Sequence, residues 1–192
     1  MDKSLIKIRH ERSKKDFPGL KLEDDEYVEF AFRRTKTYLF MIWGCMAVAL
    51  IIILLAFLLV LVGQSMIDPM GLKFLFIILT ALLAVVLFSG AIALMIYSGN
   101  KLFITNKHAI QMVMTSPTSH SVNIIDLSSV EDASFRKDSL MENIYNYGTL
   151  RLSTVGDDTT YTFKYSDVRG EDLKAITKLI SNAKKEAKKK ED

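Results

Sequence analysis

The 192-residue chain has little of what builds a disulfide scaffold or a zinc centre. It contains one cysteine, Cys45, together with three prolines and one tryptophan. A single cysteine excludes an internal disulfide framework and any zinc site built from paired cysteines. The net charge is only +3, and no long stretch interleaves basic with aromatic residues. The composition therefore argues against nucleic acid as a partner.

Charge is nearly absent from one continuous part of the chain. Only Asp68 and Lys73 of the 47 charged residues lie between positions 38 and 100, where 49 of 63 residues are hydrophobic. Two uncharged runs in this window exceed the roughly 20 residues that a helix needs to cross a bilayer, and Pro69 lies in the turn between them. The sequence therefore predicts a membrane α-helical hairpin: a helix at 38–63, a short external loop at 64–73 and a helix at 74–99.

Basic residues gather where this hairpin joins the rest of the chain. Because loops rich in lysine and arginine stay in the cytoplasm, we expect both termini to be cytoplasmic. The same residues are candidate contacts for phospholipid headgroups, although topology alone would explain them. They are Arg33, Arg34, Lys36, Lys101 and Lys107.

Neither predicted membrane helix carries an ionisable side chain in its interior. Transporters and channels usually place such groups along their pathway. The small residues Ser89, Gly90 and Ala93 would allow close helix packing. We therefore interpret the hairpin as a lipid-facing anchor with some helix packing.

After the hairpin the sequence is typical of an α+β domain over residues 100–183. Short runs rich in β-branched and apolar residues predict strands beginning near positions 101, 109, 121 and 129. Two further strands alternate strictly: Leu150 and Leu152 lie opposite polar neighbours, and Tyr161 and Phe163 alternate with Thr160, Thr162 and Lys164. We therefore predict a hairpin whose polar face is exposed to solvent and whose apolar face is buried. Gly148 precedes the first of this pair and permits a bulge or a positive φ.

A helix is predicted at the C-terminus. Apolar residues recur there at intervals of three and four, which gives one apolar stripe. We expect the first half of this helix to lie on the sheet and a lysine-rich tail, residues 184–192, to extend into solvent, where its lysines alternatively touch the anionic leaflet. The stripe consists of Leu173, Ile176, Ile180, Ala183 and Ala187.

Residues 1–37 form a cytoplasmic N-terminal segment in this interpretation. Residues 1–19 are charged and lack a sustained period, so we predict that they are mobile. Residues 27–34, YVEFAFRR, alternate as a strand does. They either pair with the C-terminal sheet or extend the first membrane helix, and the sequence leaves both readings open.

The order of these pieces resembles the bacterial pleckstrin-homology-like domain of small membrane proteins of the YdbS and YdbT type. Four segments carry the resemblance: LEDDEYVEFAFRR before the first span, then YSGNKLFITNKHAI, NIIDLSSVEDASF and SLMENIYNYGTLRLSTVG after the second. The resemblance covers residues 20 to 182. It implies a bacterial cell-membrane protein whose cytoplasmic domain is a bent antiparallel sheet capped by a C-terminal helix. It does not imply phosphoinositide binding, because the turn that corresponds to the basic loop of lipid-binding relatives offers only Lys107 and His108.

The sequence offers no set of residues arranged for catalysis. His10, His108 and His120 have no carboxylate or second histidine at a spacing that would join them in one site, so we expect each to be a solvated loop residue. Asp157 and Asp158 follow Gly156 between two strands and are typical of a turn. We predict no catalytic residue, no metal site and no cofactor, and hence no enzyme.

Two functions fit these features. The first is a non-catalytic, membrane-anchored interaction or scaffold module at the cytoplasmic membrane face, which binds a protein or another family member through a sheet edge or an apolar groove. The alternative is sensing of lipid headgroups, or assistance to export by an oligomer of the hairpin. The expected partners are membrane lipids and a protein partner or a homo- or hetero-oligomer.

Overall fold

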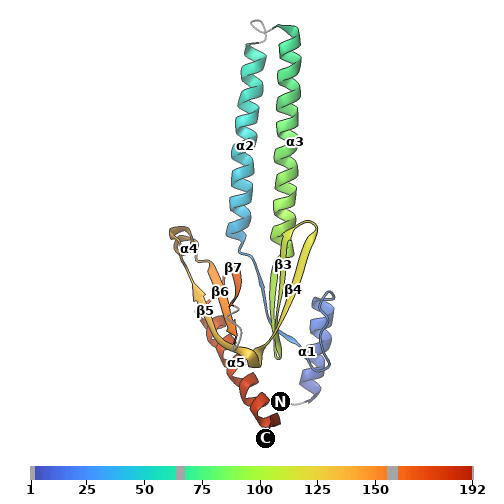
Figure 1. Cartoon of the computed structure of the whole chain (residues 1–192), viewed down its shortest axis with the longest axis vertical. Helices are drawn as coiled ribbons and strands as arrows, with labels where there is room; N and C mark the ends of the chain where they lie inside the picture. Colours follow the sequence, from blue (N-terminus) through green and yellow to red (C-terminus); the bar gives the residue numbers. More distant parts are fainter. Residues whose placement is uncertain (1–2, 64–67, 155–159, 192) are drawn as a thin grey trace. The chain divides into compact units, whose positions relative to one another are not determined.

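The computed structural model describes residues 3–63, 68–154 and 160–191, and it divides the chain into two compact units (Figure 1). One unit is Lys36–Tyr97, which contains the apolar helices. The other combines Met1–Thr35 with Ser98–Asp192 and contains all the described strands. The predicted turn at Asp157 and Asp158 lies outside the described residues.

The apolar helices are α2 (Lys36–Val62) and α3 (Pro69–Gly99), and both are long and apolar enough to cross a membrane. The prediction of a loop through residue 73 is wrong in its second half, because α3 already begins at Pro69. Proline suits the first turn of a helix, since its missing N–H has no intrahelical partner there. Asp68 caps this start: its carboxylate accepts hydrogen bonds from the backbone N–H groups of Met70 and Gly71.

Within their own unit, α2 and α3 pack through a few close contacts. Gly90 is buried, and a Cβ at this position would lie 2.3 Å from the Sδ atom of Met46. The rings of Tyr38 and Tyr97 stack 6.2 Å apart. Most of the other side chains point outwards, so the two helices bury little of their apolar surface against each other.

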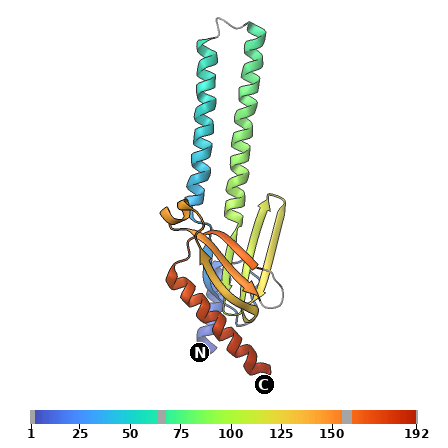
Figure 2. The same ribbon diagram turned by 60° about the vertical axis from the view of Figure 1, so that its left-hand side comes forward.

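The second unit contains two antiparallel sheets (Figure 2). The larger has the order β1-β2-β3-β4 and the smaller β5-β6-β7. All six strands predicted after the hairpin are confirmed, and residues 27–34 contribute a strand rather than a helical extension. The strands are β1 (Val28–Arg33), β2 (Lys101–Thr105), β3 (His108–Ser116), β4 (Ser119–Asp126), β5 (Val130–Arg136), β6 (Gly148–Thr154) and β7 (Thr160–Ser166).

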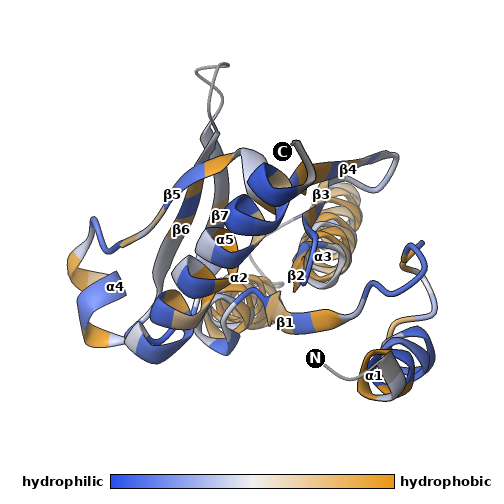
Figure 3. Ribbon diagram, turned by 90° about the horizontal axis from the view of Figure 1, so that it is seen from below, coloured by the Kyte–Doolittle hydropathy of each residue, from blue (hydrophilic) through white to orange (hydrophobic). Residues whose placement is uncertain are grey.

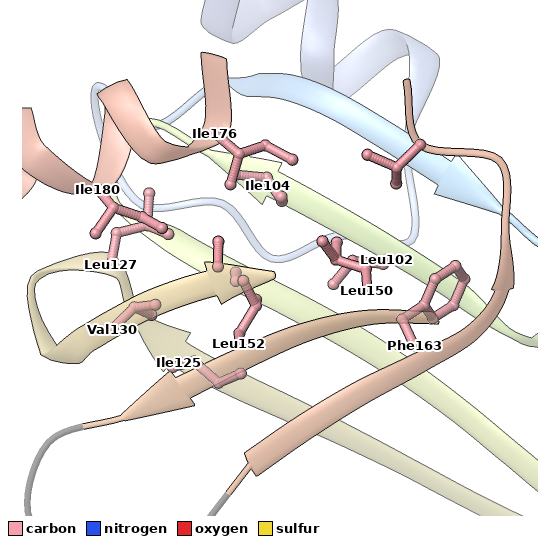
Figure 4. Close-up of a cluster of buried hydrophobic side chains, with 13 residues drawn as sticks. Leu102, Ile104, Ile125, Leu127, Val130, Leu150, Leu152, Phe163, Ile176 and Ile180 are labelled. Carbon is pink, nitrogen blue, oxygen red and sulfur yellow. The ribbon is translucent and has the colours of Figure 1, made fainter. Parts of the chain in front are cut away.

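The hydrophobic core of this unit lies between the two sheets and the C-terminal helix α5 (Gly170–Glu191) (Figure 4). Leu102 and Ile104 of β2 and Leu150 of β6 are at most 2% exposed. Ile176 and Ile180 of α5 point into the same cluster, as the apolar stripe predicted. The helix contacts β5 and the short 3-10 turn η2 (Leu127–Ser129).

The prediction that residues 1–19 are mobile is wrong for the described residues 3–19, because Lys3–Asp16 forms helix α1 and packs on the larger sheet. Ser13 Oγ accepts a hydrogen bond of 3.0 Å from the backbone of Val28. The next residue after the helix, Phe17, packs edge-on against the ring of Phe103 at 5.1 Å. These partners are distant in sequence, so the local pattern of α1 gave no sign of them.

A glycine fixes the geometry between β5 and β6. The predicted bulge is present on the other side of β6, in its pairing with β7, where the register shifts between Gly148 and Leu150. The reason for glycine, however, is a close approach rather than a positive φ. A Cβ at position 148 would lie 2.3 Å from the carbonyl oxygen of Arg136 and 2.9 Å from the ring of Phe135. Any larger side chain must push the two strands apart.

We expect Gly148→Ala to destabilise the strand-containing unit by about 1–3 kcal/mol, the usual cost of overpacking. Thermal unfolding of the full chain in detergent measures this as a lower midpoint. The matched control is Gly170→Ala at the start of α5, where an added Cβ meets nothing within 4 Å and alanine is the better helix former. Equal midpoints for the two variants would show that the contact with Arg136 is relieved at no cost.

Candidate functional site: a polar groove and a buried carboxylate

A polar groove with a volume of about 360 Å³ lies between β3 and β4 on one side and β7 on the other. Gln111 and Asn123 come from the larger sheet, and Thr160, Thr162 and Lys164 from the predicted solvent-facing side of β7. Arg34, just after β1, also lines it. The described lining therefore contains two cationic side chains and no carboxylate, which favours an anionic or strongly polar ligand.

The walls of this groove are held by specific contacts. Gln111 is 6% exposed, and its Nε2 donates a hydrogen bond of 2.8 Å to the carbonyl of Thr162, so it links the two sheets. The Arg34 guanidinium lies over the ring of Tyr165, 5.6 Å from its centre. Tyr165 has a φ of 60°, an uncommon conformation for a bulky residue. Its carbonyl accepts a hydrogen bond of 2.6 Å from the backbone N–H of Thr35.

At the other end of the larger sheet, an acidic segment, residues 23–27, lies against the β2–β3 turn, residues 105–108. The side chain of Asn106 forms two hydrogen bonds with the backbone of this segment. Its Oδ1 accepts from the N–H of Tyr27 at 2.9 Å, and its Nδ2 donates to the carbonyl of Asp25 at 3.2 Å. Lys107 Nζ lies 3.2 Å from the Glu23 carboxylate. The turn is therefore bound by the chain's own acidic residues.

Glu26 is the centre of this contact and is 1% exposed. Its Oε1 accepts a hydrogen bond of 2.6 Å from Thr105 Oγ1 and lies 2.9 Å from Nδ1 of His108. Its Oε2 accepts from the backbone N–H of Glu23 at 2.9 Å. Burial by itself raises the pKa of the Glu26 carboxyl, but the hydrogen bonds from Thr105, Glu23 and His108 together outweigh burial and hold the pKa below its ordinary value of 4.5.

The prediction that each histidine is a solvated loop residue is wrong for His10 and His108. Because a carboxylate only accepts, Nδ1 of His108 carries the proton in its contact with ionised Glu26. His10, on α1, lies with its Nδ1 2.6 Å from the carbonyl oxygen of Glu26. The partners are 82 and 16 residues apart, which is why local spacing did not reveal them. His120 is exposed, as expected, but it lies in β4 rather than in a loop.

The candidate headgroup contacts do not form one cluster. Arg33 and Lys101 are register partners in β1 and β2, and Arg34 lies beside them at the groove. Lys36 is the first residue of α2. Lys107 lies at the far end of β2 and pairs with Glu23. Sequence reasoning missed Lys164 as a groove residue, although the alternation of β7 had already assigned it to the solvent-facing side.

Among the residues that the structure describes, no group of three or more His, Cys, Asp or Glu side chains is placed to hold a metal ion. The buried carboxylate and His108 form a pair, and every acceptor atom of the Glu26 carboxylate already has a partner. Their arrangement fastens the acidic segment to the turn.

Comparison with known proteins yields a loose structural likeness. No family model matches the chain, and no curated protein matches it. The chain is similar to the crystal structure of a DUF1696 family protein with a pleckstrin-homology domain from Shewanella loihica PV-4, with a TM-score of 0.32 and 16% identity. The match covers 44% of this chain and 70% of that one. Membership of the YdbS and YdbT type remains a prediction.

We expect the stability of this unit to fall in acid through Glu26. Because its folded pKa lies below 4.5, the ionised carboxylate contributes stability above its ordinary pKa, and that contribution is lost as the pH falls through the folded value. Glu26→Gln should cost about 1–3 kcal/mol at pH 7 and flatten the acid dependence. Denaturant unfolding of the full chain from pH 7 to pH 3 measures both.

The control for this change is Glu23→Gln, which removes an exposed ion pair with Lys107. Such pairs contribute about 0–1 kcal/mol, so this variant should stay close to the wild type. If Glu26→Gln retained the wild-type pH dependence, the acid sensitivity would have to come from other carboxylates.

Proposed function

We propose that the protein is a non-catalytic, membrane-anchored interaction module with two membrane spans and with both termini in the cytoplasm. The strand-containing unit would then be a pleckstrin-homology-like domain at the cytoplasmic membrane face of a bacterium. The main support for this proposal is the exposed apolar surface of α2 and α3. Of their described side chains only Ile53 is buried, while Leu59, Val62 and Phe88 are 70% exposed or more.

The free energy of exposing apolar side chains to water supports the membrane assignment. Leaving one large apolar side chain in water rather than burying it costs about 1.5–3 kcal/mol. More than a dozen such side chains are exposed along α2 and α3, so an apolar environment such as a bilayer would stabilise this surface. The basic residues Arg33, Arg34, Lys36 and Lys101 flank the two helices on the side of the termini and support the cytoplasmic orientation.

The β4 edge supports a protein partner that adds an extended strand. β4 is an edge strand of the four-stranded sheet, and no described strand pairs with its outer side. Val122 and Ile124 on this strand are 56% and 62% exposed. Ile124 continues an apolar row across the sheet, since it pairs with Ile110 and Ile110 pairs with Phe103. Backbone pairing at such an edge gives affinity, and the apolar side chains give specificity.

Crosslinking in native membranes, followed by pull-down and mass spectrometry, tests this proposal. We expect a stable protein neighbour, or a second copy, and we expect the double change Val122→Asn and Ile124→Asn to remove it. Leu5→Asn with Ile8→Asn is the matched control, because these α1 side chains are also exposed and apolar, at 51% and 62%. Recovery of the wild type as a lone monomer would contradict the proposal.

A second function, sensing of anionic lipid headgroups, is favoured by the polar groove, whose described lining holds Arg34 and Lys164 without a carboxylate. The export alternative lacks such support, because Gly90 packs on the apolar side chain of Met46 rather than on a polar cavity.

Nanodiscs with and without phosphatidylglycerol test headgroup binding. A ligand that binds only the folded protein raises its unfolding midpoint, so phosphatidylglycerol should stabilise the wild type and much less the Lys164→Glu variant. Lys178→Glu, a change of equal charge on the exposed side of α5, is the control. Equal stabilisation of all three proteins would argue against the groove as a headgroup site.

A further inference from the structure

The β5–β6 connection contains a short helix, α4 (Leu140–Ile144), which together with its C-cap residue, Tyr145, exposes four large side chains. We call them the α4 patch: Leu140 is 82% exposed, Met141 55%, Ile144 71% and Tyr145 57%. Their spacing places them together on one side of a helical turn. Figure 3 shows this connection with hydrophobic residues on both sides of its hydrophilic ones. None of the four residues lies in the hydrophobic core, so this dense apolar cluster on a short helix and its C-cap has no role there.

The α4 patch is held in a fixed conformation. Ser139 and Glu142 form a capping box, in which Ser139 Oγ accepts from the N–H of Glu142 at 3.2 Å and the Glu142 carboxylate accepts from the N–H of Ser139 at 3.0 Å. At the end of the connection, Asn146 has a φ of 54° and accepts a hydrogen bond from Lys137 Nζ. The exposure of the patch is therefore built into the loop and is not a consequence of an unstructured segment.

The position of the patch points to what covers it. Tyr147, two residues after the patch's Tyr145, is buried and its ring lies 6.0 Å from that of Tyr165. Gly148 pairs with Ser166, and Ser166 forms a bridge with Arg34. Neighbouring strands are about 4.8 Å apart, so two such steps place Gly148, at the start of β6, only about 10 Å from Arg34. Arg34 is followed by Thr35 and then by α2.

The same end of the sheets also connects to α3, because Lys101, which follows α3 by one residue, is the register partner of Arg33. The α4 patch thus projects from the end of the unit at which the chain continues into both apolar helices. Arg136 and Lys137 precede the patch, and Asp138 and Glu142 balance them. The surplus of charge at this end comes from Arg33, Arg34 and Lys101 and is positive, as an anionic leaflet requires.

We propose that the α4 patch inserts into the interface between headgroups and acyl chains of the same bilayer that holds α2 and α3. Leu140, Met141 and Ile144 would enter the acyl boundary, and Tyr145 would lie at headgroup level, where amphipathic rings are favoured. The patch is then a third membrane contact, which fixes how the strand-containing unit faces the bilayer. This inference rests on the proposed membrane anchoring of the chain.

Depth-dependent fluorescence quenching tests the inference on the full chain. Cys45→Ser removes the one native cysteine, and single cysteines labelled with an environment-sensitive nitrobenzoxadiazole probe are then introduced by Ile144→Cys, Leu59→Cys or Ile8→Cys. Each protein is reconstituted into vesicles of phosphatidylcholine and phosphatidylglycerol, with or without doxyl-labelled lipid. Leu59 on α2 reports membrane insertion. Ile8 on α1 is the matched control, with 62% exposure on a helix that contacts the opposite end of β1 from Arg33.

We expect doxyl lipid to quench the probe at Ile144 and at Leu59 and to leave the probe at Ile8 unchanged. If doxyl lipid quenched the probe at Leu59 but left the probe at Ile144 unchanged, as at Ile8, this inference would be overturned. The proposed membrane anchor would still be supported. A blue-shifted probe at Ile144 that doxyl lipid does not quench would overturn it in favour of a protein surface over α4. An unquenched probe at Leu59 would contradict the proposed anchor itself.

Discussion

The pairing of β1 with β2 is the constraint on which the rest of the strand-containing unit depends. The two strands lie on either side of a 62-residue insertion, Lys36–Tyr97, yet they pair in antiparallel register from Val28 to Arg33. Arg33 and Lys101 therefore come together at the points where the chain leaves the unit and returns to it. Because the closure of so long a loop carries an entropic cost, the pairing needs stabilising contacts beyond its own backbone hydrogen bonds.

The buried Glu26 carboxylate supplies part of that stabilisation. It receives hydrogen bonds from the turn that follows β2 and from the segment that precedes β1, so it fastens the two strands at the end distant from the insertion. Helix α1 adds a second layer, through Ser13 on the backbone of Val28 and through Phe17 on Phe103. An ionised buried group is stabilising only when its acceptors are satisfied, and here each carboxylate oxygen has a partner.

The parts of the fold that sequence predicted correctly are those whose signal is local. Alternation of polar and apolar residues predicted β6 and β7, and apolar residues at intervals of three and four predicted the buried face of α5. The uncharged runs predicted α2 and α3. The parts that it missed depend on partners far away in the chain. α1 has no apolar stripe of its own, and Glu26 and His108 are 82 residues apart. Local pattern likewise did not reveal that Lys107, a candidate headgroup contact, forms an ion pair with Glu23.

The polar groove and α4 are linked by a residue that sequence had no reason to single out. Tyr165 adopts a φ of 60°, which costs of order 1–3 kcal/mol for a side chain of this kind. Its ring contacts both Tyr147, which follows α4, and the guanidinium of Arg34, which lines the groove, while its carbonyl holds the N–H of Thr35. These three contacts support the strained conformation. A change at Tyr165 would therefore disturb the groove, the α4 connection and the last residue before α2 at once, whereas a change in any one of those parts leaves two of the contacts in place.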